Sequence, residues 1–192
     1  MYIGVCGLQG SGKSSLAKYL QEKYPDYILI DIDKVGHLVN ELPQVKKELV
    51  ETFGDILTDN KVDRKKLGKI VFNDKEKMNK LIDITWKHME EYIDNLIKGH
   101  NNVIFDWQLL PLSKFFKMCD IKILLDIPYD VRKDRVIKRD HVTEEYFDKR
   151  DKSGYNYNRE DFDIVLKDNN YQDIDFVISS KKAWQYFKFW YT

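Results

Sequence analysis

The sequence predicts an α/β protein built on a parallel β-sheet. Two features of the sequence support this class. Short apolar runs of strand length alternate with longer segments whose apolar residues recur every three or four positions. A glycine-rich loop at 7–14 joins the first apolar run to the first helical segment. Strands that alternate with helices form parallel sheets with right-handed crossovers, and a chain of 192 residues fits a single domain over 1–192.

Five strands are expected. Four of them are short apolar runs, at 2–6, 27–32, 103–106 and 121–127. The fifth lies at either 163–166 or 175–178, because both segments are short and apolar and the pattern does not choose between them.

Helical segments fill the intervals between these strands. The first follows the glycine loop at 14–24, and four more are expected at 33–42, 43–53, 63–72 and 74–98. Pro43 suits the first turn of a helix, and Gly54 suits a helix end. The segment 59–61 reads Asp-Asn-Lys and predicts a turn. Another helix is expected to start at Pro128.

The loop at 7–14 reads Gly-Leu-Gln-Gly-Ser-Gly-Lys-Ser, which matches the pattern of a nucleotide phosphate-binding loop. Its glycines permit close backbone approaches, so that amide groups can point at a phosphate. Lys13 supplies a mobile charge, and Ser14 offers a hydroxyl to Mg²⁺. The following helix adds its positive end. An ordinary glycine turn before a helix is the alternative. The expected ATP-binding residues are Gly7, Gly10, Ser11, Gly12, Lys13, Ser14, Ser15 and Arg135.

Three carboxylates stand where expected strands end. Asp31 and Asp33 close the second strand, and Asp106 closes the third. Ligands of a parallel sheet bind beyond the carboxyl ends of its strands, so we expect these side chains to face the cavity opened by the loop. Phosphoryl transfer needs a base that orients the attacking hydroxyl, and Asp33 is our candidate. Asp31 or Asp106 would hold Mg²⁺ directly or through water. Alternatively, Asp33 simply caps the following helix.

Basic residues form a second candidate set. Arg132, Arg135 and Arg139 share one helical face, and Arg150 follows in the polar stretch. Arginines on a lid can neutralise charge on a transferring phosphoryl group. A solvated charged face is the alternative, and it applies most to Arg132 because acids and lysines are interspersed.

His37 and Arg64 are candidates for binding the phosphate acceptor. His37 lies one turn after Asp33 and is placed to line an acceptor pocket. Arg64 stands at an expected helix start, where it either reaches a substrate phosphate or pairs with a neighbouring acid.

Composition excludes several classes of partner. The 32 basic and 32 acidic residues give a formal net charge of 0, which argues against a protein that coats nucleic acid or an anionic membrane. No apolar run approaches the ~20 residues of a membrane span, and the start shows no secretion signal. Cys6 and Cys119 have no metal-type spacing, so we expect a reduced, cytoplasmic setting. The protein is expected to be a monomer or a small homo-oligomer.

The end of the chain, 184–191, is densely aromatic. We expect it to form a final helix that docks on the sheet. Contact with a membrane or a partner is the alternative.

Taken in order, these motifs resemble those of the dephospho-CoA kinase family, a branch of the P-loop nucleotide kinases. The resemblance covers roughly 1–150. Its residues are the glycine loop, Asp31-Ile32-Asp33, Phe53-Gly54-Asp55, Asp63-Arg64 with Leu67, Val71-Phe72, and the spacing of Arg135, Arg139 and Arg150.

The resemblance implies a P-loop kinase three-layer sandwich with a central five-stranded parallel sheet and a helical lid. The lid would occupy roughly 138–161 and an acceptor-side helical region roughly 34–98. The implied activity is ATP- and Mg²⁺-dependent phosphorylation of the ribose 3′-hydroxyl of dephospho-CoA, the last step of coenzyme A biosynthesis. The implied catalytic residues are Asp33, Lys13 and Arg139. The implied acceptor-binding residues are Asp31, His37, Arg64 and Asp106.

The chain departs from the family pattern mainly on the acceptor side. Trp86-Lys87 replaces a His-Pro pair, and Gln108 and Leu112 replace a proline and a glutamate. A nucleoside or nucleoside monophosphate therefore stays open as the acceptor. An ATP-binding regulator without an acceptor is a second alternative.

Overall fold

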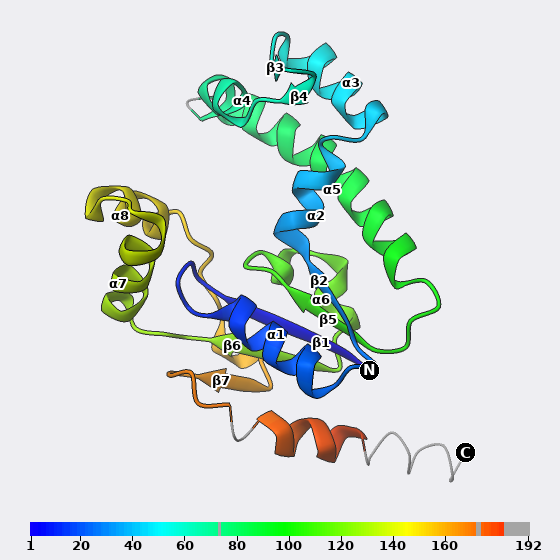
Figure 1. Ribbon diagram of the computed structural model, residues 1–192, viewed down its shortest axis with the longest axis vertical. Helices are drawn as coiled ribbons and strands as arrows, with labels where there is room; N and C mark the ends of the chain where they lie inside the picture. The colour runs from blue at the N-terminus through cyan, green and yellow to red at the C-terminus, as the bar shows by residue number, and fades with distance from the viewer. Residues whose placement is uncertain (73, 172–173, 183–192) are drawn as a thin grey trace. The chain divides into compact units, whose positions relative to one another are not determined.

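The computed structural model describes residues 1–72, 74–171 and 174–182 (Figure 1). The expected docking of the aromatic segment 184–191 lies outside these residues. The chain forms two compact units. The first comprises Met1–Asp31 and the chain from His100 onward, and the second comprises Ile32–Gly99.

The first unit is built on a five-stranded sheet in which every neighbouring pair is parallel. The strand order is β2 (Ile28–Asp31), β5 (Val103–Asp106), β1 (Tyr2–Gly7), β6 (Ile121–Leu125) and β7 (Ile164–Leu166). The predicted five-stranded parallel sheet is confirmed.

The structure decides which of the two late segments is the fifth strand. Residues 164–166 pair with β6, whereas 174–182 is helical. Ile174 and Ile178 are both fully buried. Their spacing of four puts both on the buried face of this helix.

Helices cover both faces of the sheet and make the layers of the sandwich (Figure 1). On one face, α1 (Lys13–Lys23) buries Leu16 and Leu20 in a cluster with Ile3 and Val5 of β1. On the other face, a Cβ at Gly4 would lie 2.8 Å from Leu110 and 2.9 Å from Cys119. This second layer contains the short helices η1 (Leu110–Leu112) and α6 (Lys114–Met118), which the sequence pattern did not predict.

The chain reverses its direction of winding at β1. From β1 it passes through α1 to β2 on one side, whereas from β6 it passes to β7 on the other. The second connection contains α7 (Tyr129–Asp140), α8 (Glu144–Lys152) and η2 (Arg159–Asp161). Ligands of open parallel sheets bind at such a reversal, beyond the carboxyl ends of the strands.

The second unit is mostly helical. It contains α2 (Ile32–Val39), α3 (Pro43–Phe53), α4 (Arg64–Val71) and α5 (Lys75–Ile97), and α5 packs against the other three. Pro43 occupies the first turn of α3, as predicted. The predicted turn at 59–61 joins β3 (Leu57–Thr58) to β4 (Lys61–Val62). Asp59 and Asn60 have φ of 50° and 61°, which suits a two-residue hairpin turn.

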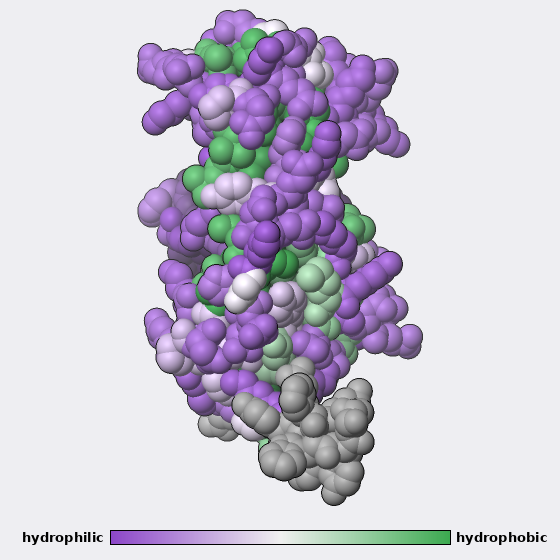
Figure 2. Space-filling model, turned by 90° about the vertical axis from the view of Figure 1, so that its right-hand side faces the viewer, coloured by the Kyte–Doolittle hydropathy of each residue, from purple (hydrophilic) through white to green (hydrophobic). Residues whose placement is uncertain are grey.

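The surface drawn in Figure 2 is mostly hydrophilic, with apolar residues gathered in small areas. Among the described helices, none combines the length and the apolar character needed to cross a membrane. Cys6 and Cys119 are free and buried.

Candidate active site

The glycine loop runs from the end of β1 to the start of α1. Gly10 and Gly12 have φ of 81° and 94°, a conformation that side chains other than glycine rarely adopt. A Cβ would also lie 2.6 Å from the carbonyl oxygen of Arg132 at Gly10, and 2.8 Å from Asn169 Nδ2 at Gly12. These contacts explain why the two glycines are required. The amides of Ser15 and Leu16 donate to the Gly12 carbonyl, so α1 begins directly behind the loop.

Beside this loop lies a cavity of about 420 Å³. Its walls come from the loop and the first turn of α1, from two arginines of α7, and from the chain after β7. The lining residues are Gly10, Gly12, Lys13, Ser14, Ser15, Arg135, Arg139, Asn169 and Tyr171. The volume is within the range of small-molecule sites. Most of the expected ATP-binding residues therefore meet at one cavity, with Arg139 beside them. Gly7 ends β1 and Ser11 is fully buried, so neither is among the lining residues.

The two lining arginines differ in their contacts. Arg135 Nη1 donates to the carbonyls of Gly10 and Ser11, at 3.4 and 3.5 Å. Arg139 forms a bidentate pair with Asp140, at 2.6 and 2.7 Å. These hydrogen bonds raise the pKa of Arg139 and lower the pKa of Asp140. At the pocket, Arg135 and Arg139 add positive charge to one wall.

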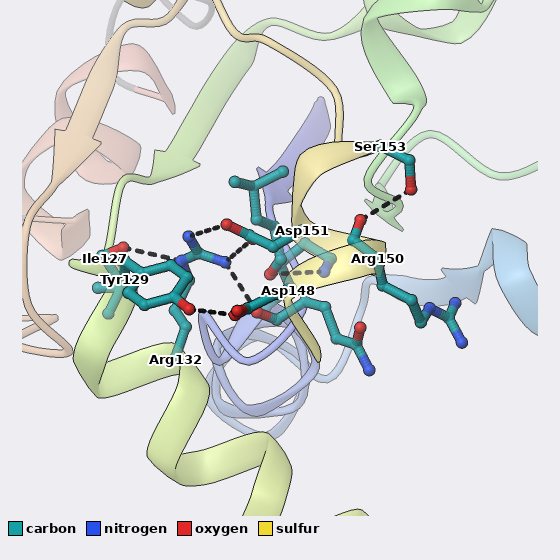
Figure 3. Close-up of polar contacts among 10 residues, drawn as sticks. Ile127, Tyr129, Arg132, Asp148, Arg150, Asp151 and Ser153 are labelled. Atoms are coloured by element: carbon teal, nitrogen blue, oxygen red, sulfur yellow. Dashed lines mark hydrogen bonds and ion pairs between the residues drawn. The ribbon is translucent and has the colours of Figure 1, made fainter. Parts of the chain in front are cut away.

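Arg132 does not have the solvated, charged-surface role that was the alternative for this position. Only 5% of it is exposed, because its guanidinium lies between α7 and α8 and pairs with Asp151 (Figure 3). The neighbouring acids and lysines of α7 suggested a solvated face, whereas this side chain is covered by contacts with α8 and the glycine loop. Arg150 is exposed and donates to the hydroxyl of Tyr146 at 3.1 Å.

Three polar residues at this site were not singled out from the sequence. Asn169 Nδ2 donates to the Ser11 carbonyl at 3.1 Å and to the Tyr171 hydroxyl at 3.2 Å. Tyr157 accepts from the Gly7 amide at 3.1 Å and donates to the Gln108 carbonyl at 2.7 Å. Tyr157 lies within the expected lid stretch, and Asn169 and Tyr171 follow it. The sequence carried no motif at these positions, and β7, which lies between them, had two candidate positions.

Asp31 and Asp106 end neighbouring strands in register. Asp106 is also the register partner of Val5 on β1, two residues before Gly7. The two carboxylates are therefore at the same edge of the sheet as the glycine loop, on strands about 4.8 Å apart. Among the described residues, no group of three or more His, Cys, Asp or Glu side chains is arranged to hold a metal. Mg²⁺ commonly uses one or two carboxylates with substrate phosphates, and this donor set fits that chemistry.

A smaller cavity of about 230 Å³ lies within the second unit. His37 and Arg64, two expected acceptor-binding residues, both line it, together with apolar side chains that include Leu67 and Val71. Asp33 is exposed and lies in the first turn of α2, which begins at Ile32. It is therefore inside the helix, not at the residue that precedes it. The spacing of four puts Asp33 and His37 on one face of α2.

The acid next to Arg64 has a structural role. Asp63 caps α4, accepting from the amides of Lys65 and Lys66 at 2.9 and 3.1 Å. Hydrogen bonds from the Lys66 amide and the Thr58 hydroxyl lower the pKa of Asp63. This cap holds the start of α4, and with it Arg64, against the hairpin.

Comparison with known proteins agrees with this geometry. The family model described as dephospho-CoA kinase matches residues 1–172. A dephospho-CoA kinase from Fusobacterium nucleatum is 35% identical over 182 residues, covering 91% of this chain and 93% of that protein. Among solved structures, TT1252 from Thermus thermophilus has a TM-score of 0.80 at 22% identity, covering 95% of this chain and 96% of its own. Dephospho-CoA kinase from Campylobacter jejuni has a TM-score of 0.60 at 22% identity, with 95% and 98% coverage. The chain belongs to the dephospho-CoA kinase family.

Proposed function

We propose that this chain transfers the γ-phosphate of ATP to the ribose 3′-hydroxyl of dephospho-CoA, the last step of coenzyme A biosynthesis. The observation that carries the proposal is the cavity that combines the glycine loop, the start of α1, Arg135 and Arg139 in a member of this family.

On the ATP side, the loop amides and the N-terminus of α1 would bind the phosphates. Lys13 would contact the outer phosphates, and Arg135 and Arg139 would neutralise charge that develops during transfer. Ser14 with Asp31 or Asp106 would hold Mg²⁺, which supplies charge neutralisation at the β- and γ-phosphate oxygens. Asn169 and Tyr171 line the same cavity, and we assign them to the nucleoside end of ATP.

On the acceptor side, Asp33 would accept the proton of the attacking hydroxyl. The cavity lined by His37 and Arg64 combines polar side chains, Glu41 and Asn40 among them, with a larger number of apolar ones. Arg64 would contact a phosphate of the acceptor, and the apolar side chains suit its nonpolar parts. We therefore assign 34–98 to the acceptor and 138–161 to a lid that excludes water during transfer, within one kinase domain.

We also propose a cytoplasmic location. Both thiols are free and buried, and burial raises the pKa of Cys119 to about 12. Such thiols remain protonated and unreactive, which suits a compartment where disulfides do not form.

The test is a panel of acceptors. The purified protein would be incubated with MgATP and dephospho-CoA, a deoxynucleoside, a nucleoside monophosphate, or no acceptor. We expect a new 3′-phosphate on dephospho-CoA, detected by phosphorus NMR, and little turnover with the other acceptors. The alternative of a nucleoside or nucleotide kinase is based on the departures from the family pattern at Trp86-Lys87, Gln108 and Leu112. Phosphorylation of a nucleoside or nucleotide, but not of dephospho-CoA, would establish that alternative. If ATP is hydrolysed at a rate that no acceptor changes, the protein is an ATP-binding regulator without an acceptor.

A further inference from the structure

We propose that Arg132 is a positioning residue for ATP binding, which orients the Gln9–Gly10 peptide of the glycine loop and joins helix α8 to that loop. This proposal rests on the proposed function in one respect, that the loop binds ATP.

A single guanidinium contacts three segments of the chain (Figure 3). Arg132 Nε donates to the Ile127 carbonyl at 3.0 Å, just before α7. Nη1 donates to the Gln9 carbonyl at 3.4 Å. The two terminal nitrogens donate to the two oxygens of Asp151 on α8, at 2.5 and 3.3 Å. The group also lies 5.9 Å from the centroid of the Phe147 ring. One side chain therefore links the base of α7, the glycine loop and α8.

The chemistry of this position requires arginine. A guanidinium presents several donors in a fixed plane, whereas an ammonium is a compact charge on a flexible stem. The planar fork matches the carboxylate of Asp151 and leaves other donors for Ile127 and Gln9. Because the group is buried, its charge also needs the partner carboxylate.

The consequence for the loop follows from its peptide geometry. Three successive carbonyls accept hydrogen bonds from arginines of α7: that of Gln9 from Arg132, and those of Gly10 and Ser11 from Arg135. The C=O and the N–H of a trans peptide unit point in opposite directions. A Gln9 carbonyl held on the α7 side therefore turns the Gly10 N–H away from α7. Amides with this orientation are what a phosphate-binding loop needs.

Helix α8 makes further contacts with the start of α7. Asp148, one turn before Asp151, accepts from the hydroxyl of Tyr129 on α7 (Figure 3), and the Tyr129 and Phe147 rings are 5.5 Å apart. A second ion pair between the same helices provides a control. Lys133 and Glu144 are 2.6 Å apart. Within the part of the chain that the structure describes, the hydrogen bonds, ion pairs and cation–π contact of this pair involve α7 and α8 and not the glycine loop.

The experiment compares two matched double variants. Arg132→Met with Asp151→Leu replaces the buried pair by apolar side chains, a change that preserves packing in other proteins but removes the donor to Gln9. Lys133→Met with Glu144→Leu makes the same kind of change at the control pair. ATP affinity is measured by calorimetry without acceptor, and steady-state assays give kcat and the KM of each substrate. Hydrogen–deuterium exchange measures how well the backbone amides of residues 8–12 in the glycine loop are protected.

We expect the Arg132/Asp151 variant to bind ATP about tenfold more weakly, the scale of one lost hydrogen bond to a charged group. Exchange of the loop amides should be faster, while the acceptor KM and kcat stay within about twofold. The Lys133/Glu144 variant should match the wild type. If the first double variant does not fold, Arg132→Lys keeps the charge beside Asp151 but not the fork, and it should show the same loss.

Unchanged ATP affinity in a folded Arg132 variant overturns the proposal. Equal losses in both double variants also overturn it, since they would show that any link between α7 and α8 has this effect. Because ATP binding is measured without acceptor, an incorrect acceptor in the proposed function leaves this result standing.

Discussion

At the scale of the residue, Gly10 shows how closely the glycine loop and α7 approach. Its φ of 81° and the carbonyl oxygen of Arg132, 2.6 Å from an added Cβ, each oppose substitution. Gly99 has a nearly identical φ of 83° with nothing within 4 Å of an added Cβ. Comparing substitutions at Gly10 and Gly99 therefore separates the effect of backbone strain, which both share, from the effect of steric contact, which only Gly10 has.

We expect Gly10→Ala to weaken ATP binding by at least about tenfold, because the loop must move to relieve the contact. Gly99→Ala should cost about 1–2 kcal/mol of stability from its φ alone and leave ATP affinity unchanged. Calorimetry and thermal unfolding of both variants make the comparison. Wild-type affinity in Gly10→Ala would mean that the loop relaxes without cost.

Asp33 is the proposed base of the transfer reaction. Asp33→Asn removes the proposed base and should lower kcat by about 10²-fold or more, while ATP affinity stays within about twofold. Asp55→Asn is the control, because Asp55 is an exposed acid of the same unit that pairs with Lys66. Normal turnover of Asp33→Asn would exclude Asp33 as the base.

At the scale of the element, Asp175 anchors the helix at 174–182 to α1. Its carboxylate accepts a hydrogen bond from the Lys23 ammonium. It also accepts from the hydroxyls of Tyr19 and Tyr24, and both of these bonds are 3.1 Å long. Burial disfavours the charged form, but these hydrogen bonds outweigh it and lower the pKa of Asp175. A carboxyl whose pKa is lower in the folded state stabilises the fold above its unfolded pKa of about 3.9. That contribution is lost as the pH falls through the folded pKa.

We therefore expect Asp175→Asn to destabilise the protein by about 1 kcal/mol at pH 7, or about 2–4 °C in Tm. The difference from wild type should shrink as the pH falls below about 4. Thermal unfolding between pH 7 and pH 3 measures it. Glu51→Gln at the exposed Lys47–Glu51 pair should change little at either pH. A deficit that stays constant with pH would mean that the ionised form of Asp175 is not what stabilises the helix.

At the scale of the whole molecule, ligand binding should appear as stability. MgATP at one hundred times its Kd should raise the free energy of unfolding by about 2.7 kcal/mol, or about 5–11 °C in Tm. Chelating the metal with EDTA should remove part of this shift and stop turnover, because the proposed transfer needs Mg²⁺. ATP that stabilises and turns over equally well in EDTA would remove Mg²⁺ from the proposal.

Much of the fold could be predicted because its signals are local. The glycine loop, the helix after it and the apolar runs of four strands are read from neighbouring residues. His37 and Arg64, which were singled out from the sequence, both line one cavity, and their acceptor-binding role stays a proposal. The turn at 59–61 was predicted, but the strands β3 and β4 on either side of it were missed, as were the short helices η1 and α6. Segments of two to five residues carry too little periodicity.

Local patterns were enough to predict the parallel α/β class, the glycine loop and the resemblance to a kinase family, since each rests on motifs of neighbouring residues. Long-range packing makes 164–166, not 175–178, the fifth strand, buries Arg132 between two helices, and brings Asn169 and Tyr157 to the glycine loop. These outcomes depend on contacts between residues far apart in the chain, whose partners no local pattern specifies.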